Sequence, residues 1–196
     1  MKIARIVSSN SHIDYVGRVI DEFDVDSPPT QGDLGFGDLV SINVEEQRLI
    51  GVIYDSRLIN PEYANFGPRL SPAPSAATFT PDFIGEQGIL IGILLLGVTD
   101  ESGSTLHGIP RQIIPPGNYV ENMDNESVRK FHTDSDGKMQ MHYYSQITAN
   151  AGSVAIPLLE AIIAMLVRDC PEKDRKRFDL LRQNLKWQRT VGGIRA

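Results

Sequence analysis

The chain has 196 residues, of which 41% are hydrophobic and 22% are charged, and its formal net charge is −6. This composition is typical of an ordinary folded protein and excludes a fibrous or intrinsically disordered chain. Its single cysteine, Cys170, excludes an intramolecular disulfide framework, so we expect a reduced, cytoplasmic setting.

Neither a secretion signal nor a membrane helix is expected from the sequence. Residues 1–11 alternate apolar and polar side chains in the manner of a strand, without the basic start and apolar run of a signal peptide. The most apolar runs, residues 88–98 and 154–167, are shorter than the roughly 20 residues that a membrane helix needs. We therefore expect no membrane among the partners of this chain.

The N-terminal part carries a series of short segments rich in β-branched residues. Residues 1–7 alternate like a strand, and residues 16–20, 37–42 and 49–54 are apolar and are interrupted or opened by glycine. Glycine occurs where strands bend sharply or backbones approach closely, and a Gly-Asp pair before Leu39 is typical of a turn into a strand. The sequence therefore predicts the opening strands of a small β-barrel.

Two loops and one long strand follow in this part of the chain. Prolines and glycines predict loops over residues 24–37 and, at greater length, over residues 60–85. Residues 89–98 are apolar apart from two glycines, which favours a strand buried on both faces over a helix. The Pro-Pro-Gly sequence at 115–117 precedes a last short strand, so we expect the barrel to end near Met123.

Residues 131–143 are predicted to form a β-hairpin, because Asp136-Gly137 between alternating flanks is a strong two-residue turn signal. The alternative is a metal site or calcium loop built from His132, His142 and the neighbouring aspartates. In the hairpin register the two histidines lie on opposite faces, and the distal carboxylate of a calcium loop is missing. The pattern favours the structural hairpin, and we expect no metal or cofactor.

Residues 153–167 predict a helix that is apolar almost all round. Such a helix must be buried, either in its own domain or in an oligomer interface. A second helix is expected from Asp169 to about Gly192, so that residues 150–196 form a helical hairpin. The candidate oligomer-interface residues are Leu158, Leu159, Ile162, Ile163 and Leu166.

Charge is divided unevenly along the chain. Residues 1–167 carry 10 Lys and Arg against 21 Asp and Glu, a balance of −11, whereas residues 168–196 carry 9 against 4, a balance of +5. A basic tail can bind nucleic acid, or it can dock on its own barrel or a neighbouring subunit, and the docking alternative is favoured. The candidate contact residues are the basic residues and the tryptophan of the second helix: Arg175, Lys176, Arg182, Lys186, Trp187 and Arg189.

Five glycine-anchored or proline-anchored motifs in residues 1–123 resemble one known family. The motifs are Val16-Gly17-Arg18-Val19-Ile20, Phe36-Gly37-Asp38-Leu39-Val40, Ile50-Gly51-Val52-Ile53, Asn60-Pro61 and Pro115-Pro116-Gly117-Asn118-Tyr119-Val120. In this order they are similar to the HAS barrel, the N-terminal domain shared by HerA-type DNA translocases and rotary ATP synthase subunits. The resemblance implies a barrel that forms the rim of a hexamer and, in HerA-type proteins, contacts a partner nuclease.

The ATPase core that follows the barrel in HerA-type proteins is not expected here. Residues 139–147 predict a strand and residues 148–153 a turn into the apolar helix, which suggests the topology of a phosphate-binding loop. The Gly-x-x-x-x-Gly-Lys-Ser/Thr sequence that binds phosphate and Mg²⁺ is missing. The histidines are tied to no nucleophile by sequence, so an enzyme is not expected.

The sequence thus predicts a mainly β fold with a helical C-terminal appendage. A small closed or partly open β-barrel (1–123) is followed by a β-hairpin or strand connector (124–149) and a helical hairpin with a basic surface (150–196). The expected function is a non-catalytic assembly or protein-interaction module, oligomeric, whose partner is a second copy, a nuclease or an ATPase. The alternatives are weak nucleic-acid binding by the basic helix and, last, nucleotide sensing by the degenerate loop.

Overall fold

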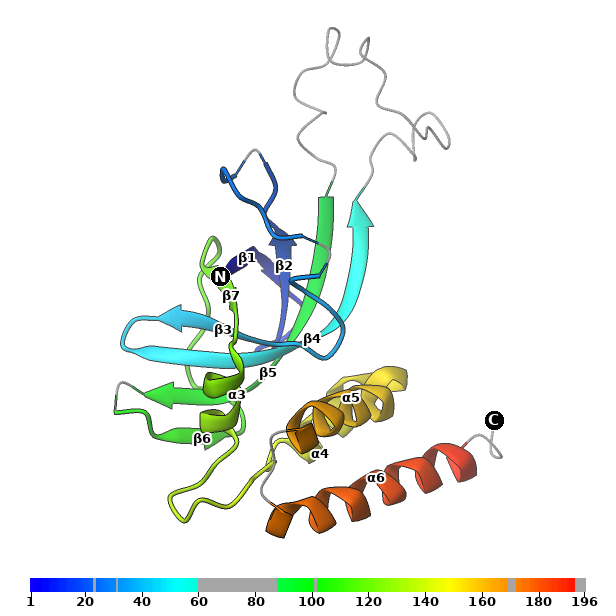
Figure 1. Cartoon of the computed structure of the whole chain (residues 1–196). Coiled ribbons are helices and arrows are strands. Elements are labelled where there is room, and N and C mark those ends of the chain that lie inside the picture. Colours follow the sequence, from blue (N-terminus) through cyan, green and yellow to red (C-terminus); the bar gives the residue numbers. More distant parts are fainter. Residues whose placement is uncertain (23, 31, 60–87, 101, 169–171, 193–196) are drawn as a thin grey trace, which may run out of the picture.

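A computed structural model of the chain describes residues 1–22, 24–30, 32–59, 88–100, 102–168 and 172–192 (Figure 1). In the last range the side chains of 173 and 188–192 are excepted. The predicted loop over residues 60–85 therefore lies outside the described residues, as does Cys170.

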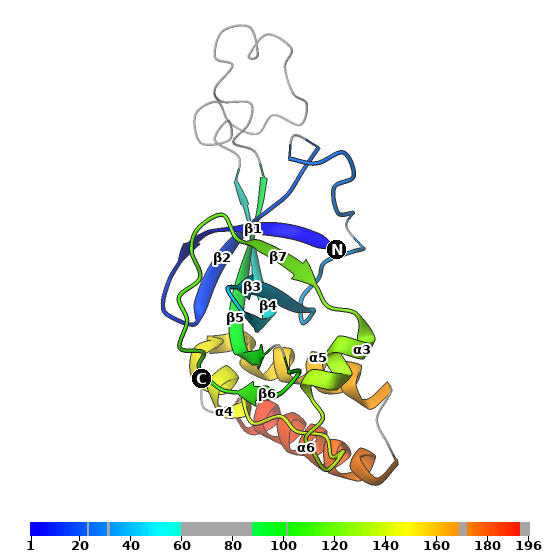
Figure 2. The same cartoon turned by 90° about the vertical axis from the view of Figure 1, so that its left-hand side faces the viewer.

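Six antiparallel strands close into a barrel, which confirms the predicted β-barrel. They follow the order β2-β1-β7-β3-β4-β5, and pairing of β2 with β5 closes the circle (Figures 1 and 2). A short seventh strand, β6, pairs with the end of β5. The strands are β1 (Lys2–Ser9), β2 (Asp14–Val19), β3 (Leu39–Val44), β4 (Gln47–Ile59), β5 (Gly88–Asp100), β6 (Thr105–His107) and β7 (Tyr119–Asn122).

Close backbone approach explains two of the glycines in the strands. A Cβ atom at Gly51 would lie 2.7 Å from Cγ2 of Ile93 on the neighbouring strand. A Cβ atom at Gly97 would lie 2.3 Å from the carbonyl oxygen of Leu106. Both separations are too short for real atoms, so only glycine fits these positions of a barrel this narrow.

The hairpin of β4 and β5 is longer than the barrel that contains it. Its register runs from the pair Gln47 and Asp100 to the pair Ile59 and Gly88. Strand β3 pairs with β4 only as far as Val52. The far end of the β4–β5 hairpin therefore projects from the barrel, beside the segment that connects β2 to β3 (Figure 1).

The connector between the barrel and the C-terminal helices differs from the prediction. It contains two helices, α3 (Asn125–Phe131) and α4 (Tyr144–Asn150), and the predicted hairpin is reduced to one isolated bridge between Thr133 and Met139. The sequence signal of Asp136-Gly137 marks a real turn, but Asp134 closes it by accepting hydrogen bonds from the backbone N–H groups of Asp136 and Lys138. A strand ladder does not follow, because helices flank the turn.

Two local causes explain why helices replace the predicted strands. Asp124 caps α3, since its carboxylate accepts a 2.7 Å hydrogen bond from the N–H of Ser127, and the helix buries Val128 and Phe131 on one side. The sequence predicts a strand over residues 139–147, but α4 begins at Tyr144 and takes up the second part of that range. The suggested phosphate-loop topology is therefore wrong, because a helix and not a strand precedes the turn at Gly152.

The predicted helical hairpin is confirmed. After a 3-10 turn, η2 (Gly152–Val154), the chain forms α5 (Ala155–Arg168) and α6 (Glu172–Gly192). Both views place α5 between the barrel and α6 (Figures 1 and 2). The five candidate interface residues are consequently buried in the core of the chain itself, which corrects their assignment to an oligomer interface: Leu158, Leu159, Ile162, Ile163 and Leu166.

Helix α6 is fixed to the rest of the chain by apolar and polar contacts. Phe178 and Leu185 are buried in the core. The backbone of Met139 is held from both sides, because Arg177 donates a 3.2 Å hydrogen bond to its carbonyl oxygen and the carboxylate of Asp174 lies 3.5 Å from its nitrogen. None of the helices in the described part of the chain is long and apolar enough to cross a membrane.

Candidate functional site

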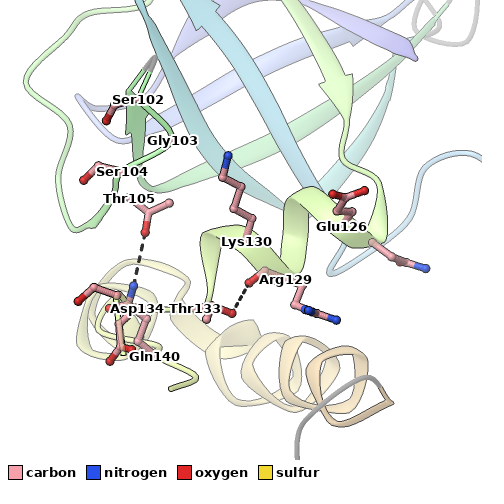
Figure 3. A pocket seen from close by; sticks show the side chains of 12 residues that line it. Ser102, Gly103, Ser104, Thr105, Glu126, Arg129, Lys130, Thr133, Asp134 and Gln140 are labelled. Carbon is pink, nitrogen blue, oxygen red and sulfur yellow. Dashed lines mark hydrogen bonds between the residues drawn. The ribbon is translucent and has the colours of Figure 1, made fainter. Parts of the chain in front are cut away.

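A polar cavity of about 1070 Å³ opens where the turn between β5 and β6 faces α3 (Figure 3). Two cations line it, but they diverge: Lys130 extends toward the turn at Gly103, whereas Arg129 points away from that turn. Glu126 and Asp134 bring opposite charge to the same walls. Because the charges do not converge on one point, the cavity lacks the arrangement that an anionic ligand would need.

Three hydroxyl groups of this cavity take part in hydrogen bonds within the protein. Thr133 donates a 2.7 Å hydrogen bond to the carbonyl oxygen of Arg129, and the amide of Gln140 donates a 3.5 Å bond to the hydroxyl of Thr105. The hydroxyl of Ser102 donates to the carboxylate of Asp100. Among the described lining residues no histidine stands beside these hydroxyls.

Three histidines meet at the joint between the barrel and the connector. The ring of His107, on β6, lies 5.8 Å from that of His132 and 5.7 Å from that of His142. His132 is buried and His142 is exposed. Sequence reasoning missed His107 as the residue that brings them together, because its partners lie far along the chain and no local pattern links them.

Hydrogen bonds fix the tautomers of the two inner histidines. His132 donates from Nδ1 to the carbonyl oxygen of Val128 at 2.7 Å and accepts at Nε2 from the hydroxyl of Tyr143 at 2.5 Å. His107 accepts at Nδ1 from the backbone N–H of His142 and donates from Nε2 to the carbonyl oxygen of Phe131. All four ring nitrogens are thus engaged within the protein.

Burial keeps both inner histidines neutral. It lowers the pKa of His132 to about 4 and also lowers the pKa of His107, to which the neighbouring His142 adds a smaller effect in the same direction. Within the described residues, no group of three or more His, Cys, Asp or Glu is arranged to hold a metal ion. The cluster therefore holds the connector to the barrel, and the ring nitrogens of His107 and His132 are both taken up by hydrogen bonds within the protein.

An apolar groove of about 560 Å³ lies beside the projecting β4–β5 hairpin. One wall comes from the hairpin, where Leu58 is 83% exposed and Ile89 is also exposed. The other wall comes from the segment between β2 and β3, which contributes Leu34 and the exposed Phe36. Large apolar side chains gathered around one concave surface are typical of a docking site.

The second wall of this groove belongs to an acidic segment. Residues 21–38 contain six acidic residues and no Lys or Arg, and two of the six, Asp21 and Asp24, pair with Arg18 of β2 at 3.1 Å and 2.6 Å. Asp33 accepts two 2.7 Å hydrogen bonds from Thr30, from its backbone N–H and its hydroxyl, and these bonds lower the pKa of the Asp33 carboxyl. Thr30 lines the groove, so the negative charge of Asp33 stands at its rim. Asp55 lines the groove on the hairpin side, where its carboxylate pairs with Arg57 at 3.3 Å.

Most of the predicted contact residues on α6 are accessible to solvent. Arg175, Lys176 and Lys186 are exposed, and Arg182 is partly exposed. Trp187 is 65% exposed. The side chain of the last candidate, Arg189, lies outside the described residues.

Comparison with known proteins gives the family of this chain. No curated protein matches the sequence. A family model described as a domain of unknown function (DUF8166) matches residues 1–195, which is nearly the whole chain. The chain therefore belongs to the DUF8166 family.

Proposed function

We propose that this chain is a non-catalytic protein-interaction module, the kind of function that its resemblance to the barrel of HerA-type DNA-processing ATPases implies. Its docking site is the groove that Leu34 and Phe36 form with the β4–β5 hairpin. The ligand is an apolar segment that carries basic residues, and the setting is the cytoplasm. The observation that supports this proposal is the pairing of exposed apolar side chains with an acidic rim.

The chemistry of the groove suits binding better than bond making. Leu34, Phe36, Leu58 and Ile89 offer a surface that gains free energy when apolar side chains cover it. The carboxylate of Asp33 is held ionised by Thr30 and attracts Lys or Arg at the rim. Apolar contact supplies affinity in such an arrangement, and charge supplies selectivity and a faster encounter.

Titration with two synthetic helical peptides tests this function. Both peptides carry Leu and Trp seven residues apart. The basic peptide has Lys and Arg at the remaining exposed positions, and the acidic peptide has Glu there. Fluorescence anisotropy with the full chain should show the basic peptide binding at least about tenfold more tightly than the acidic one. Equal affinity for both peptides, or no binding of either, would contradict the proposal.

A matched pair of leucine variants locates the binding. Leu58→Ser removes an exposed side chain from the groove and should weaken the basic peptide about tenfold. Leu106→Ser removes a leucine that is 68% exposed on β6 and does not line the groove, so it should leave the affinity unchanged. Equal losses in the two variants would place the binding elsewhere.

A second candidate function is nucleic-acid binding by α6. The exposed Trp187 on a basic helix supports it, because an aromatic ring can stack on a base while neighbouring cations contact phosphates. Labelled single- and double-stranded DNA at low salt provides the test, with charge reversal at Arg175, Lys176 and Arg182. Binding that falls steeply with salt and disappears in the charge-reversed variant would support this function; undetectable binding at low salt contradicts it.

A further inference from the structure

Helix α6 carries an apolar stripe that nothing in the described part of the chain covers. Leu180 is 66% exposed and Trp187 is 65% exposed. Seven residues separate them, so they lie on one face of the helix, about 10 Å apart along its axis. Phe178 and Leu185 lie on the opposite face and are buried. The helix is therefore anchored by one apolar face and presents a second one to solvent.

The charge around this stripe complements the charge around the groove. Residues 172–187 contain six basic and three acidic residues, and one of the acidic residues, Asp174, is buried. The segment between β2 and β3, which supplies one wall of the groove, has six acidic and no basic residues over positions 21–38, and two of the six, Asp21 and Asp24, pair with Arg18. Each surface thus combines exposed apolar side chains with charge opposite to that of the other.

We infer that the occupant of the groove is α6 of a second copy of this chain. In this contact Leu180 and Trp187 enter the apolar groove against Leu58 and Phe36, while the basic residues of α6 face the acidic wall. The inference depends on the proposed function, because it names the ligand of the same groove. It goes beyond that function by making the chain its own partner.

The contact must join two chains, because one chain cannot make it with itself. Helix α5 lies between the barrel and α6 in both views (Figures 1 and 2). Burial of Phe178 and Leu185 fixes α6 in that position. A groove that takes up the helix of the next copy leaves its own helix free for another, so the association is head to tail and forms rings or chains.

Sedimentation of the full chain measures the association. We expect the average mass to rise with concentration between about 10 and about 500 µM, since a single helix in a groove buries less surface than a standard interface. The rise should shrink in high salt, because screening weakens the attraction between the basic helix and the acidic wall. A groove variant, Leu58→Ser, and a helix variant, Leu180→Ser with Trp187→Ala, should each remain monomeric.

Mixing these two variants gives the decisive result. The groove variant keeps an intact helix, and the helix variant keeps an intact groove, so the mixture has one working contact for each pair of chains. We expect the mixture to form a one-to-one dimer and nothing larger. The control variant Leu106→Ser, altered outside both surfaces, should associate like the unaltered chain.

Failure of this inference differs from failure of the proposed function. A chain that stays monomeric at all concentrations but binds the basic peptide in its groove overturns self-association and leaves the groove function standing. A chain that associates equally well in the groove and helix variants also overturns the inference. Binding of labelled DNA through Trp187 by a chain that never self-associates would assign the stripe to nucleic acid and overturn it as well.

Discussion

The hydroxyl of Tyr143 donates a 2.5 Å hydrogen bond to Nε2 of His132, and both side chains are completely buried. The two residues join different parts of the connector, because His132 follows α3 and Tyr143 precedes α4. The ring of His107, from the barrel, lies 5.1 Å from that of Tyr143. This polar pair is therefore part of the joint that fixes the helical appendage to the barrel.

Tyr143→Phe should lower the free energy of unfolding by about 1 to 3 kcal/mol, because it leaves the buried Nε2 of His132 without a donor. Urea denaturation at neutral pH measures the change. Tyr144→Phe is the neighbouring control, since Tyr144 is only partly buried, and it should cost less than about 0.5 kcal/mol. Equal effects in the two variants would contradict the structural role of the hydrogen bond.

Mild acid should destabilise the protein through the same histidines. The pKa of His132 is about 4 in the folded chain, against 6.5 for an exposed histidine, so the unfolded state binds its proton first as the pH falls. Stability is then complete above pH 6.5 and falls as the pH drops toward 4, by about 3 kcal/mol for this residue. His107, whose pKa is also lowered by burial, adds to the loss.

Urea denaturation between pH 7.5 and pH 5 measures this dependence. The window lies above the pKa values of the aspartates whose pKa is lowered, such as Asp33 and Asp100, so their titration contributes little. His132→Gln removes one titrating group and should flatten the pH dependence, although it lowers the stability at neutral pH. An unchanged slope in that variant would show that His132 does not titrate as its burial requires.

Gly37→Ala should destabilise the chain more than Gly117→Ala. The two glycines have nearly the same backbone conformation, with φ of 90° and 89°, and either substitution costs about 1 to 2 kcal/mol for that reason. At Gly37 the added Cβ would also lie 2.9 Å from Cβ of Ala161 on α5, whereas at Gly117 it meets nothing within 4 Å. Thermal unfolding compares the pair, and equal costs would contradict tight packing of α5 on the barrel.

Ile162→Ala should cost about 2 to 5 kcal/mol, because Ile162 on α5 is fully buried. The exposed Leu180 provides the control, since Leu180→Ala should change the stability of dilute protein by less than about 0.5 kcal/mol. Urea denaturation at two protein concentrations distinguishes a role of Ile162 in the core of one chain from a role in an oligomer interface. A cost of Ile162→Ala that grows with protein concentration would restore the oligomer-interface interpretation.

Local patterns carried most of the information about individual elements. The glycine-marked apolar segments predicted the strands of the barrel, and the structure confirms them as β2, β3 and β4. The apolar run at 153–167 predicted α5 within two residues of its observed bounds. Such elements depend on neighbours a few positions apart, which a sequence displays directly.

The connector was misassigned because a single local signal, the Asp136-Gly137 turn, was extended into a strand pair. The Asp136-Gly137 turn is real, but the strands expected on both sides of it are reduced to one bridge between Thr133 and Met139, and α3 and α4 lie at the two ends of this segment. No helix was expected before residue 131, where Asp124 caps α3 by accepting a hydrogen bond from the N–H of Ser127. Burial of Val128 and Phe131 against the barrel decides for the helix, and that contact is not visible locally.

The sequence by itself determined a glycine-rich barrel, an apolar helix and a basic helix, because strand alternation, helical periodicity and turn residues act over short distances. The tertiary structure decided that the apolar helix is covered by its own chain. It also brought His107 to His132, and it placed an acidic segment beside a projecting hairpin to form a groove. These arrangements depend on contacts between distant segments, such as the pairing of Tyr15 with Ile93 that closes the barrel, and short-range patterns do not encode them.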